Sequence, residues 1–442
     1  MSAILTKNFK IMLGKQIFNL LDLSANSYLP SSRKSYIYAF MGKPIRWNTG
    51  TEVPGTPLQD DASINEYYRR GIVAKQISQE NASFVAPRID WEANTVYNTY
   101  LSDSNFYVLN SKDQVFKCLS NVAVGTASTD EPQLTLSTTS LEEPHFVTSD
   151  GYKWKYMYTL TSTQKQKFLS DEWMPVTYNK FVRAAAVGGS IDIVTVTNSG
   201  NNYTNGSSQD IVTVSGDGSG AVLKANVSSG HVQDIIIQTR GSEYTYATIS
   251  FADVTGGAGT GAAAQVAIAP HDGHGYDPVY ELNATTIMFN VEFVESETGI
   301  LPTDNDFREI AILQNPYEYE TTTLAAESIY TMYTKVKVSP GVGDFQNDEV
   351  VYQGSTFETN TFTADVISFD EVTNYLYLNN VRGTIATNQA IKGFTTSSIR
   401  VVNAVENPTL DLYSGKILYI SDKLPISRDP AQTERIRFIL SF

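Results

Sequence analysis

Alternation of apolar and polar positions with a period of two runs through much of the chain and predicts short β-strands. The clearest stretch is GYKWKYMYTL, residues 151–160. One face of the expected strand carries the rings of Tyr152, Trp154, Tyr156 and Tyr158, and the other face carries Lys153, Lys155, Met157 and Thr159. We therefore expect a half-buried strand with its rings in the core, and the alternative use of such rings is a platform on which sugars stack.

The N-terminal segment ILTKNFKIMLGKQIFNLL follows a helical period instead. Its large apolar side chains recur at helical spacing, at Phe9, Leu13, Ile17, Leu20 and Leu21. Lysines interrupt the segment at positions 7, 10 and 15. This pattern predicts an amphipathic helix that docks on the rest of the chain, not a secretory signal.

A duplication with a constant offset of 41 residues lies in the middle of the chain. Residues 191–204 match 232–245, and residues 216–227 match 257–268. Each copy offers an Ile/Val-rich strand, a Gly-x-x-Tyr-Thr turn (Gly200 with Tyr203, Gly241 with Tyr244), and a second strand pair around a glycine phrase. Repetition of this kind indicates a paired β-module.

The two glycine phrases, SGDGSGA (215–221) and GGAGTGA (256–262), could instead be phosphate-binding loops. A phosphate loop needs a helix directly after it, together with a lysine or a downstream acid. Strand-like runs without Gly-Lys-Ser/Thr follow both phrases. We therefore expect these glycines to supply positive φ and close backbone approach.

Changes in composition divide the chain and predict a mainly β, multidomain protein. The expected body is β-sandwich-like, carries the N-terminal helix, and is built from residues 1–187, 276–339 and 409–442. Two small β-domains are expected as inserts in its loops, the Gly-rich duplicated module at 188–275 and a second one at 340–408.

Bulk composition excludes several classes of function. The 442 residues include 26 Tyr and 20 Phe and carry a net charge of −15, with no basic run longer than Arg69-Arg70. This charge leaves no source for phosphate neutralisation, so we expect neither nucleic acid nor a membrane as partner. A single cysteine, Cys118, excludes a disulfide framework.

Few residues suggest chemistry. His271 and His274, with Asp272 and Asp277, form the one metal-like cluster, although a Gly-rich turn gives it no rigid support. Acidic pairs that could in principle serve a glycosidase are Asp60-Asp61, Glu142-Glu143 and Asp304/Asp306. We expect no catalytic, cofactor-binding or metal-binding residue, no cofactor, and no enzymatic activity.

Seven separated stretches, in one order, resemble the baseplate wedge proteins of the gene-product-eight type from T-even-like contractile-tailed bacteriophages. These stretches are TKNFK, YIYAFMGKPIRW (36–47), VAPRIDWEANTVYNTY (85–100), VFKCLSN, DGYKWKYMYTL, FREIAILQNPYE and SGKILYISDKLPISRDPAQTERIRFILSF. The resemblance covers about two-thirds of the chain. The two inserts have no counterpart in it. Within PRIDW we expect a buried Arg88–Asp90 brace with Trp91 packed against it, and the alternative is a contact with a partner.

The resemblance implies a structural subunit of a baseplate wedge, acting as a homodimer that connects other wedge proteins. It implies a place in the tail baseplate of the virion after assembly in the host cytoplasm. The alternative from another class is a tail-associated glycan-binding or glycan-cleaving protein, which the abundant tyrosines and scattered acids suggest. A narrower possibility is that the inserts are adhesion modules on a structural body.

Overall fold

The computed structural model describes residues 4–23, 29–30, 34–44, 53–121, 125–254, 259–294, 302–429 and 432–442, and for 207–211 the backbone only. The protein is mainly β, with 46% of its residues in strands and 12% in helices, as the sequence predicts. Parts of three expected stretches lie outside the described residues, namely 45–47, 256–258 and 430–431. None of the helices in the described ranges is long and apolar enough to cross a bilayer.

The chain divides into two compact units, each drawn from separated stretches of sequence. Unit 1 comprises Met1–Gly14, Ser83–Ile287 and Leu440–Phe442, and unit 2 comprises Lys15–Ala82 and Met288–Ile439. Helix α1 (Lys7–Leu20) runs across the boundary between these stretches.

The further elements that lie wholly or mainly in unit 1 are β3 (Ala82–Pro87), β4 (Tyr107–Leu109), β5 (Gln114–Ser120), α4 (Thr138–Glu142), β6 (Phe146–Val147), β7 (Lys153–Thr159), α5 (Ser162–Phe168), β8 (Trp173–Val176), α6 (Lys180–Ala184), β9 (Ile191–Asn201), β10 (Gly206–Gly216), β11 (Ser219–Ser228), β12 (His231–Ser242), β13 (Ala247–Ser250), β14 (Thr260–Ile268) and α7 (Pro278–Glu281). Its main sheet has the order β4-β5-β7-β6, and β3 pairs with β8.

The elements that lie wholly or mainly in unit 2 are β1 (Ile37–Gly42), α3 (Asp61–Arg70), β2 (Gly71–Ile77), η2 (Gln79–Asn81), β15 (Thr286–Phe293), β16 (Asn305–Gln314), β17 (Ile329–Thr331), β18 (Thr334–Val338), β19 (Val350–Gln353), β20 (Phe362–Asp370), β21 (Tyr375–Gly383), β22 (Ala390–Gly393), β23 (Ile399–Glu406), β24 (Lys416–Arg428) and β25 (Glu434–Ser441). A five-stranded sheet has the order β17-β2-β1-β16-β24, and β18-β21-β20-β19-β22-β23 close into a barrel around a core of aliphatic and Phe side chains.

The N-terminal helix is confirmed, but its predicted face is only partly buried. Leu21 is 1% exposed and Leu13 and Ile17 are half-buried, whereas Phe9 and Leu20 are 43% and 41% exposed. The residues buried within the helix itself are Ile11 and Gly14. A side chain at Gly14 would meet the Phe84 ring, because an added Cβ would lie 2.8 Å from its Cε1 atom. The contact face therefore passes through a glycine, which carries no hydrophobic signal in the sequence.

Strand β7 is confirmed as well, but the prediction that it is half-buried is wrong. The four rings at 152, 154, 156 and 158 are at most 3% exposed, which excludes them as a sugar platform. On the other face Met157 is fully buried and Lys155 is only 3% exposed. Lys155 lies directly opposite Lys117 of β5, and its ammonium donates to the Glu143 carbonyl at 2.7 Å. A lysine in this pattern does not guarantee a solvent-facing side.

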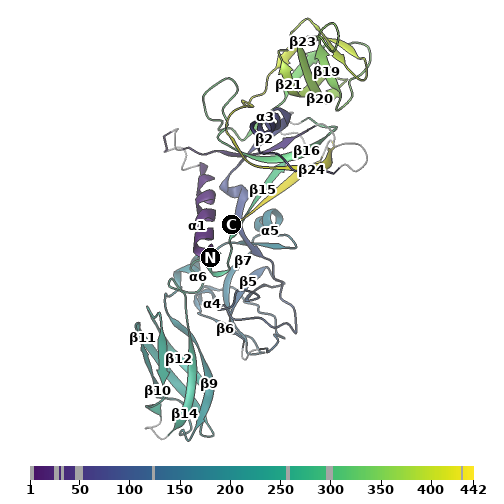
Figure 1. Cartoon of the computed structure of the whole chain (residues 1–442). Coiled ribbons are helices and arrows are strands. Elements are labelled where there is room, and N and C mark those ends of the chain that lie inside the picture. Colours follow the sequence, from purple (N-terminus) through teal and green to yellow (C-terminus); the bar gives the residue numbers. More distant parts are fainter. Residues whose placement is uncertain are drawn as a thin grey trace. The chain divides into compact units, whose positions relative to one another are not determined.

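The duplicated segment forms a module in which the two copies exchange strands (Figure 1). Strands β9 and β12 are equivalent, as are β11 and β14, yet β9 pairs with β14 and β11 pairs with β12. The two registers match at the 41-residue offset, from Ser219↔Ser242 and Thr260↔Asn201 onward. Their β-bulges fall at equivalent positions too. Each copy supplies one strand to each pair, so neither copy completes its pairing alone.

The tyrosines of the Gly-x-x-Tyr-Thr turns contact the opposite copy and so stabilise the pairing between the two copies. Tyr203 of the first copy packs on Gly259 of the second, and Tyr244 of the second packs on Gly218 of the first. Gly220 and Gly261 have φ angles of 81° and 80°. The first glycine phrase joins β10 to β11 and no helix follows it, so the phosphate-loop alternative fails there, and the expectation of positive φ and close approach is confirmed.

We predict that Gly241→Ala destabilises the module by about 2–3 kcal/mol, because a Cβ there would lie 2.6 Å from the Ala221 nitrogen and 2.6 Å from the Ser219 oxygen. Gly220→Ala is the matched control. Its φ is also positive, but its nearest heavy atom lies 3.7 Å away, so we expect only about 1 kcal/mol of strain. Hydrogen exchange of the β11 and β12 amides measures both, and equal exchange rates in the two variants would contradict the close approach.

Candidate functional site

The turn HDGHGYDP, which follows the duplicated module, does not bring its two histidines together. The His271 side chain is 97% exposed, and its Nδ1 lies 3.1 Å from Asp272 Oδ1. His274 points into unit 1 and is 4% exposed. Asp277 is engaged elsewhere, because its side chain caps α7 by accepting from the Tyr280 nitrogen. Among the described residues, no group of three or more His, Cys, Asp or Glu is arranged to hold a metal ion.

His274 belongs instead to a buried cluster with Lys117 and Glu281. The Lys117 ammonium lies 2.7 Å from His274 Nδ1 and forms an ion pair with Glu281 Oε2. Glu281 Oε1 accepts a hydrogen bond of 2.8 Å from the Gly275 nitrogen. The Tyr100 ring and the imidazole form a T-shaped pair, with ring centroids 4.6 Å apart. Strand β5, helix α7 and the turn between the module and α7 thus meet at one point.

Burial sets the charges in this cluster. It lowers the pKa of His274 to about 4, with a further contribution from the Lys117 charge, so the imidazole is neutral and its Nδ1 accepts a hydrogen bond from the Lys117 ammonium. Burial also lowers the pKa of Lys117, against the opposing pull of Glu281. Burial on its own would raise the pKa of Glu281, but Lys117 and His274 hold it at about 2. The cluster therefore contains one ammonium, one carboxylate and one neutral imidazole.

These residue types are those of a nucleophile with its base, and shifted pKa values are common at catalytic sites. Lys117 is, however, 0% exposed, and its ammonium contacts both partners. A substrate therefore has no access to this amine. The cluster connects the turn that follows the duplicated module to strand β5. This is a structural role.

Two members of the acidic pairs, Asp60 and Asp306, have structural roles. Asp60 caps helix α3 by accepting a hydrogen bond of 3.0 Å from the Ser63 nitrogen. Asp306 binds Arg308, with Nε and Oδ2 2.6 Å apart, and lies 3.0 Å from the Lys43 ammonium. Glu142 and Glu143 are exposed.

The Arg88–Asp90 brace exists but is not buried. Arg88 Nε lies 2.9 Å from Asp90 Oδ1, and the two side chains are 27% and 48% exposed. The indole nitrogen of Trp91 donates to the Ser128 hydroxyl at 3.2 Å. The prediction of a buried brace is therefore wrong, because this segment follows the end of β3 at the surface, and the alternative of a partner contact stays open.

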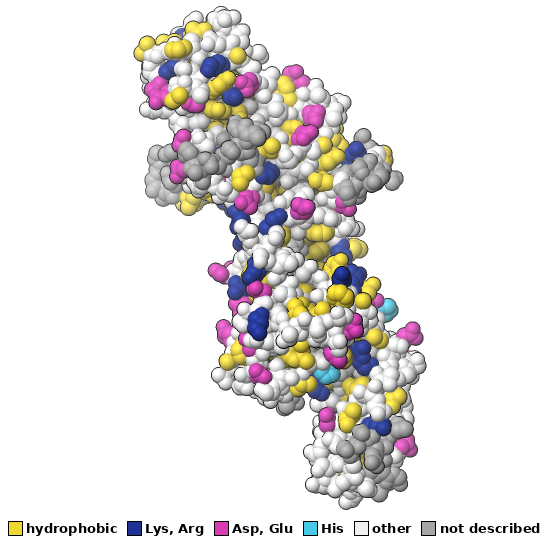
Figure 2. Space-filling view, turned by 180° about the vertical axis from the view of Figure 1, so that it is seen from behind, with side chains coloured by type: hydrophobic (Ala, Val, Ile, Leu, Met, Phe, Trp, Pro, Cys, Tyr) yellow, Lys and Arg dark blue, Asp and Glu magenta, His cyan; other side chains and the backbone are white. Residues whose placement is uncertain are grey.

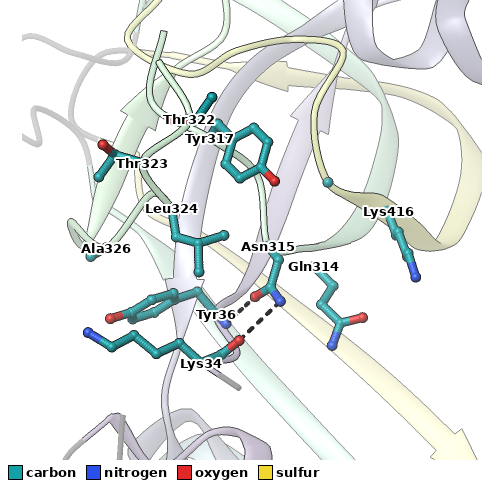
Figure 3. Close-up of a pocket in the computed structure, with 11 residues that line it drawn as sticks. Lys34, Tyr36, Gln314, Asn315, Tyr317, Thr322, Thr323, Leu324, Ala326 and Lys416 are labelled. Carbon is teal, nitrogen blue, oxygen red and sulfur yellow. Dashed lines mark hydrogen bonds between the residues drawn. The ribbon is translucent and has the colours of Figure 1, made fainter. Parts of the chain in front are cut away.

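Unit 2 contains a groove with a volume of about 920 Å³ where β1, β16 and β24 meet the loop after β16 (Figure 3). Its lining residues are Lys34, Tyr36, Gln314, Asn315, Tyr317, Thr322, Thr323, Leu324, Ala326, Gly415 and Lys416. The carboxamide of Asn315 fixes one wall, since its Oδ1 accepts from the Tyr36 nitrogen at 2.7 Å and its Nδ2 donates to the Lys34 carbonyl at 3.2 Å. No local sequence pattern marks this groove, because its walls come from three separate stretches of the chain.

Comparison with protein-family models and with curated proteins finds no match for this chain.

Proposed function

We propose that this chain is a structural subunit of a contractile-tail baseplate wedge, acting as a homodimer that connects other wedge proteins in the virion. The observation that carries the proposal is a contrast between interior and surface. The most reactive-looking group in the described residues, Lys117, is sealed in the core, while many large apolar side chains remain exposed. A protein of this kind acts through contacts and not through a reacting group.

The exposed apolar residues occur in both units. Examples from unit 1 are Leu101 (69%) and Tyr178 (56%), and examples from unit 2 are Phe394 (57%), Tyr413 (58%) and Leu424 (56%). The face in Figure 2 carries such side chains in small groups among interspersed acidic and basic ones. Aromatic and aliphatic anchors surrounded by polar residues are typical of permanent protein interfaces.

The free edge of β24 is poorly suited to main-chain pairing with a partner. This edge strand has a register shift opposite Phe307/Glu309, and it contains Lys423 and Pro425. Bulges, lysines and prolines are devices that prevent edge-to-edge pairing. The proposed contacts therefore use side-chain surfaces.

The test is the mass of the purified chain in solution at micromolar concentration. We expect light scattering to give twice the 48.7 kDa of one chain. A monomer at every concentration tested would argue against the homodimer. Mixing with the other proteins of an isolated contractile tail is the second half of the experiment, and the absence of any stable complex there would remove the proposed role.

A further inference from the structure

We propose that the groove between β1, β16 and β24 in unit 2 binds an extended acidic peptide segment of a partner protein. This inference rests on the proposed function in one respect only, namely that the peptide comes from a partner protein. The groove itself is defined by the described residues.

The charge of the groove is opposite to that of the chain. The chain carries a net charge of −15, yet the lining residues include two lysines and no carboxylate. Within the described part of the chain, neither the Lys34 ammonium nor the Lys416 ammonium forms an ion pair. Glu318 lies outside the lining, and its Oε1 accepts from the Tyr330 hydroxyl at 3.3 Å. Two unpaired cations beside a hollow without acids favour an anionic ligand.

Some of the neutral polar groups that line the groove are already hydrogen-bonded within the protein, and others are free to bind a ligand. The Asn315 carboxamide is used on both sides to hold the segment before β1, and the Gln314 amide donates to the Ser35 hydroxyl at 3.2 Å. The hydroxyl groups of Tyr36 and Tyr317 make no hydrogen bond to another described residue. In Figure 3, Lys34 and Lys416 lie on opposite sides of Asn315, with the Tyr317 ring above it. A ligand can thus meet a cation at each end, with the Tyr36 hydroxyl next to Lys34 and the Tyr317 hydroxyl between the two lysines in this view.

The size and the apolar part of the wall favour a peptide over an acidic saccharide. A volume of about 920 Å³ accommodates several residues. Leu324 and Ala326 add an aliphatic surface next to the Tyr36 ring, as Figure 3 shows, and this surface suits Leu or Val side chains. A saccharide would present hydroxyl groups to the same surface and leave them without partners.

The experiment uses the full chain and a blocked, fluorescently labelled peptide of alternating Glu and Leu. We expect binding that weakens about tenfold in the K34Q/K416Q variant and weakens as salt increases. The matched control is K112Q/K180Q, which removes two exposed lysines of unit 1 and is expected to bind like the wild type. A peptide of alternating Gln and Leu is expected to bind about tenfold more weakly than the acidic one.

Three results would overturn the inference. They are no binding of the acidic peptide at low salt, equal binding by the K34Q/K416Q variant, and tighter lysine-dependent binding of an oligogalacturonate than of the peptide. Light scattering of the same variant separates this outcome from the proposed function. A variant that remains dimeric but loses the peptide supports the groove, and a dimer that never binds the peptide removes the groove inference alone.

Discussion

Replacing Glu281 with glutamine is expected to reduce the free energy of unfolding of unit 1 by about 3–5 kcal/mol near neutral pH. The change keeps the size of the side chain and its bond to the Gly275 nitrogen, but it leaves the Lys117 ammonium without a carboxylate in the core. His274 cannot replace the lost negative charge, because an imidazole is either neutral, as it is here, or cationic. The loss is thus the cost of burying the Lys117 charge without a counter-ion or of releasing its proton on folding, whichever is smaller at the given pH.

The pH dependence of this loss has a definite sign. Without Glu281, the pKa of Lys117 in the folded state falls further below its unfolded value of 10.5, so folding must release a proton. The deficit of the E281Q variant relative to the wild type therefore shrinks as the pH rises towards that value. The double variant K117M/E281L removes both charges and is expected to lose less than E281Q. Hydrogen exchange of the β5 amides measures each variant, and a pH-independent deficit would contradict this account.

The second large effect is expected from Glu309→Gln in unit 2. Glu309 is fully buried, and no N–H or O–H donor of another residue reaches its carboxyl oxygens, but a protonated Glu309 can itself donate to Asp422. Asp422 of β24 lies opposite it in the sheet. Burial raises the pKa of Glu309 to about 8, the Arg70 charge opposes this shift, and Asp422 adds to it. Glu309 is therefore protonated in the folded protein at neutral pH.

Because the folded state holds a proton that the unfolded state releases, wild-type stability falls as the pH rises from about 4.5 to about 8. Glutamine cannot ionise, so the E309Q variant lacks this decline. Above about pH 8 we expect it to be more stable than the wild type by up to about 4 kcal/mol, and below about pH 4.5 the two should be similar.

Urea unfolding of the full chain across this pH range measures the difference between the two proteins. Glu371→Gln, at an exposed turn between β20 and β21, is the matched control and should follow the wild type at every pH. A constant difference between E309Q and the wild type would show that Glu309 is not protonated in the folded state.

The duplicated module could be predicted from the sequence, because segments that match at a constant offset of 41 residues indicate equivalent strands. It could not show that β9 pairs with β14 and β11 with β12, since equivalence does not identify a partner. Strand β7 is as predicted, but its second face is not, because Lys155 buries its aliphatic stem and its ammonium donates a hydrogen bond to a carbonyl.

The two site candidates were beyond sequence reasoning for the same physical reason. Lys117 lies 157 residues before His274 and 164 before Glu281, and no local pattern marks a lysine that a distant turn will cover. The groove likewise combines Lys34, a loop after β16 and the start of β24. Only the fold brings such residues together. Because buried lysines are rare, a lysine in a sequence is first predicted to lie at the surface.

A density map of an assembled contractile tail would decide whether this chain is a baseplate subunit. We expect both units of the chain to fit density in the baseplate, with copies in pairs and with exposed residues such as Phe394, Tyr413 and Leu424 covered by neighbouring protein. A baseplate whose density is fully explained by other chains, or copies of this chain with these residues facing solvent, would contradict this expectation.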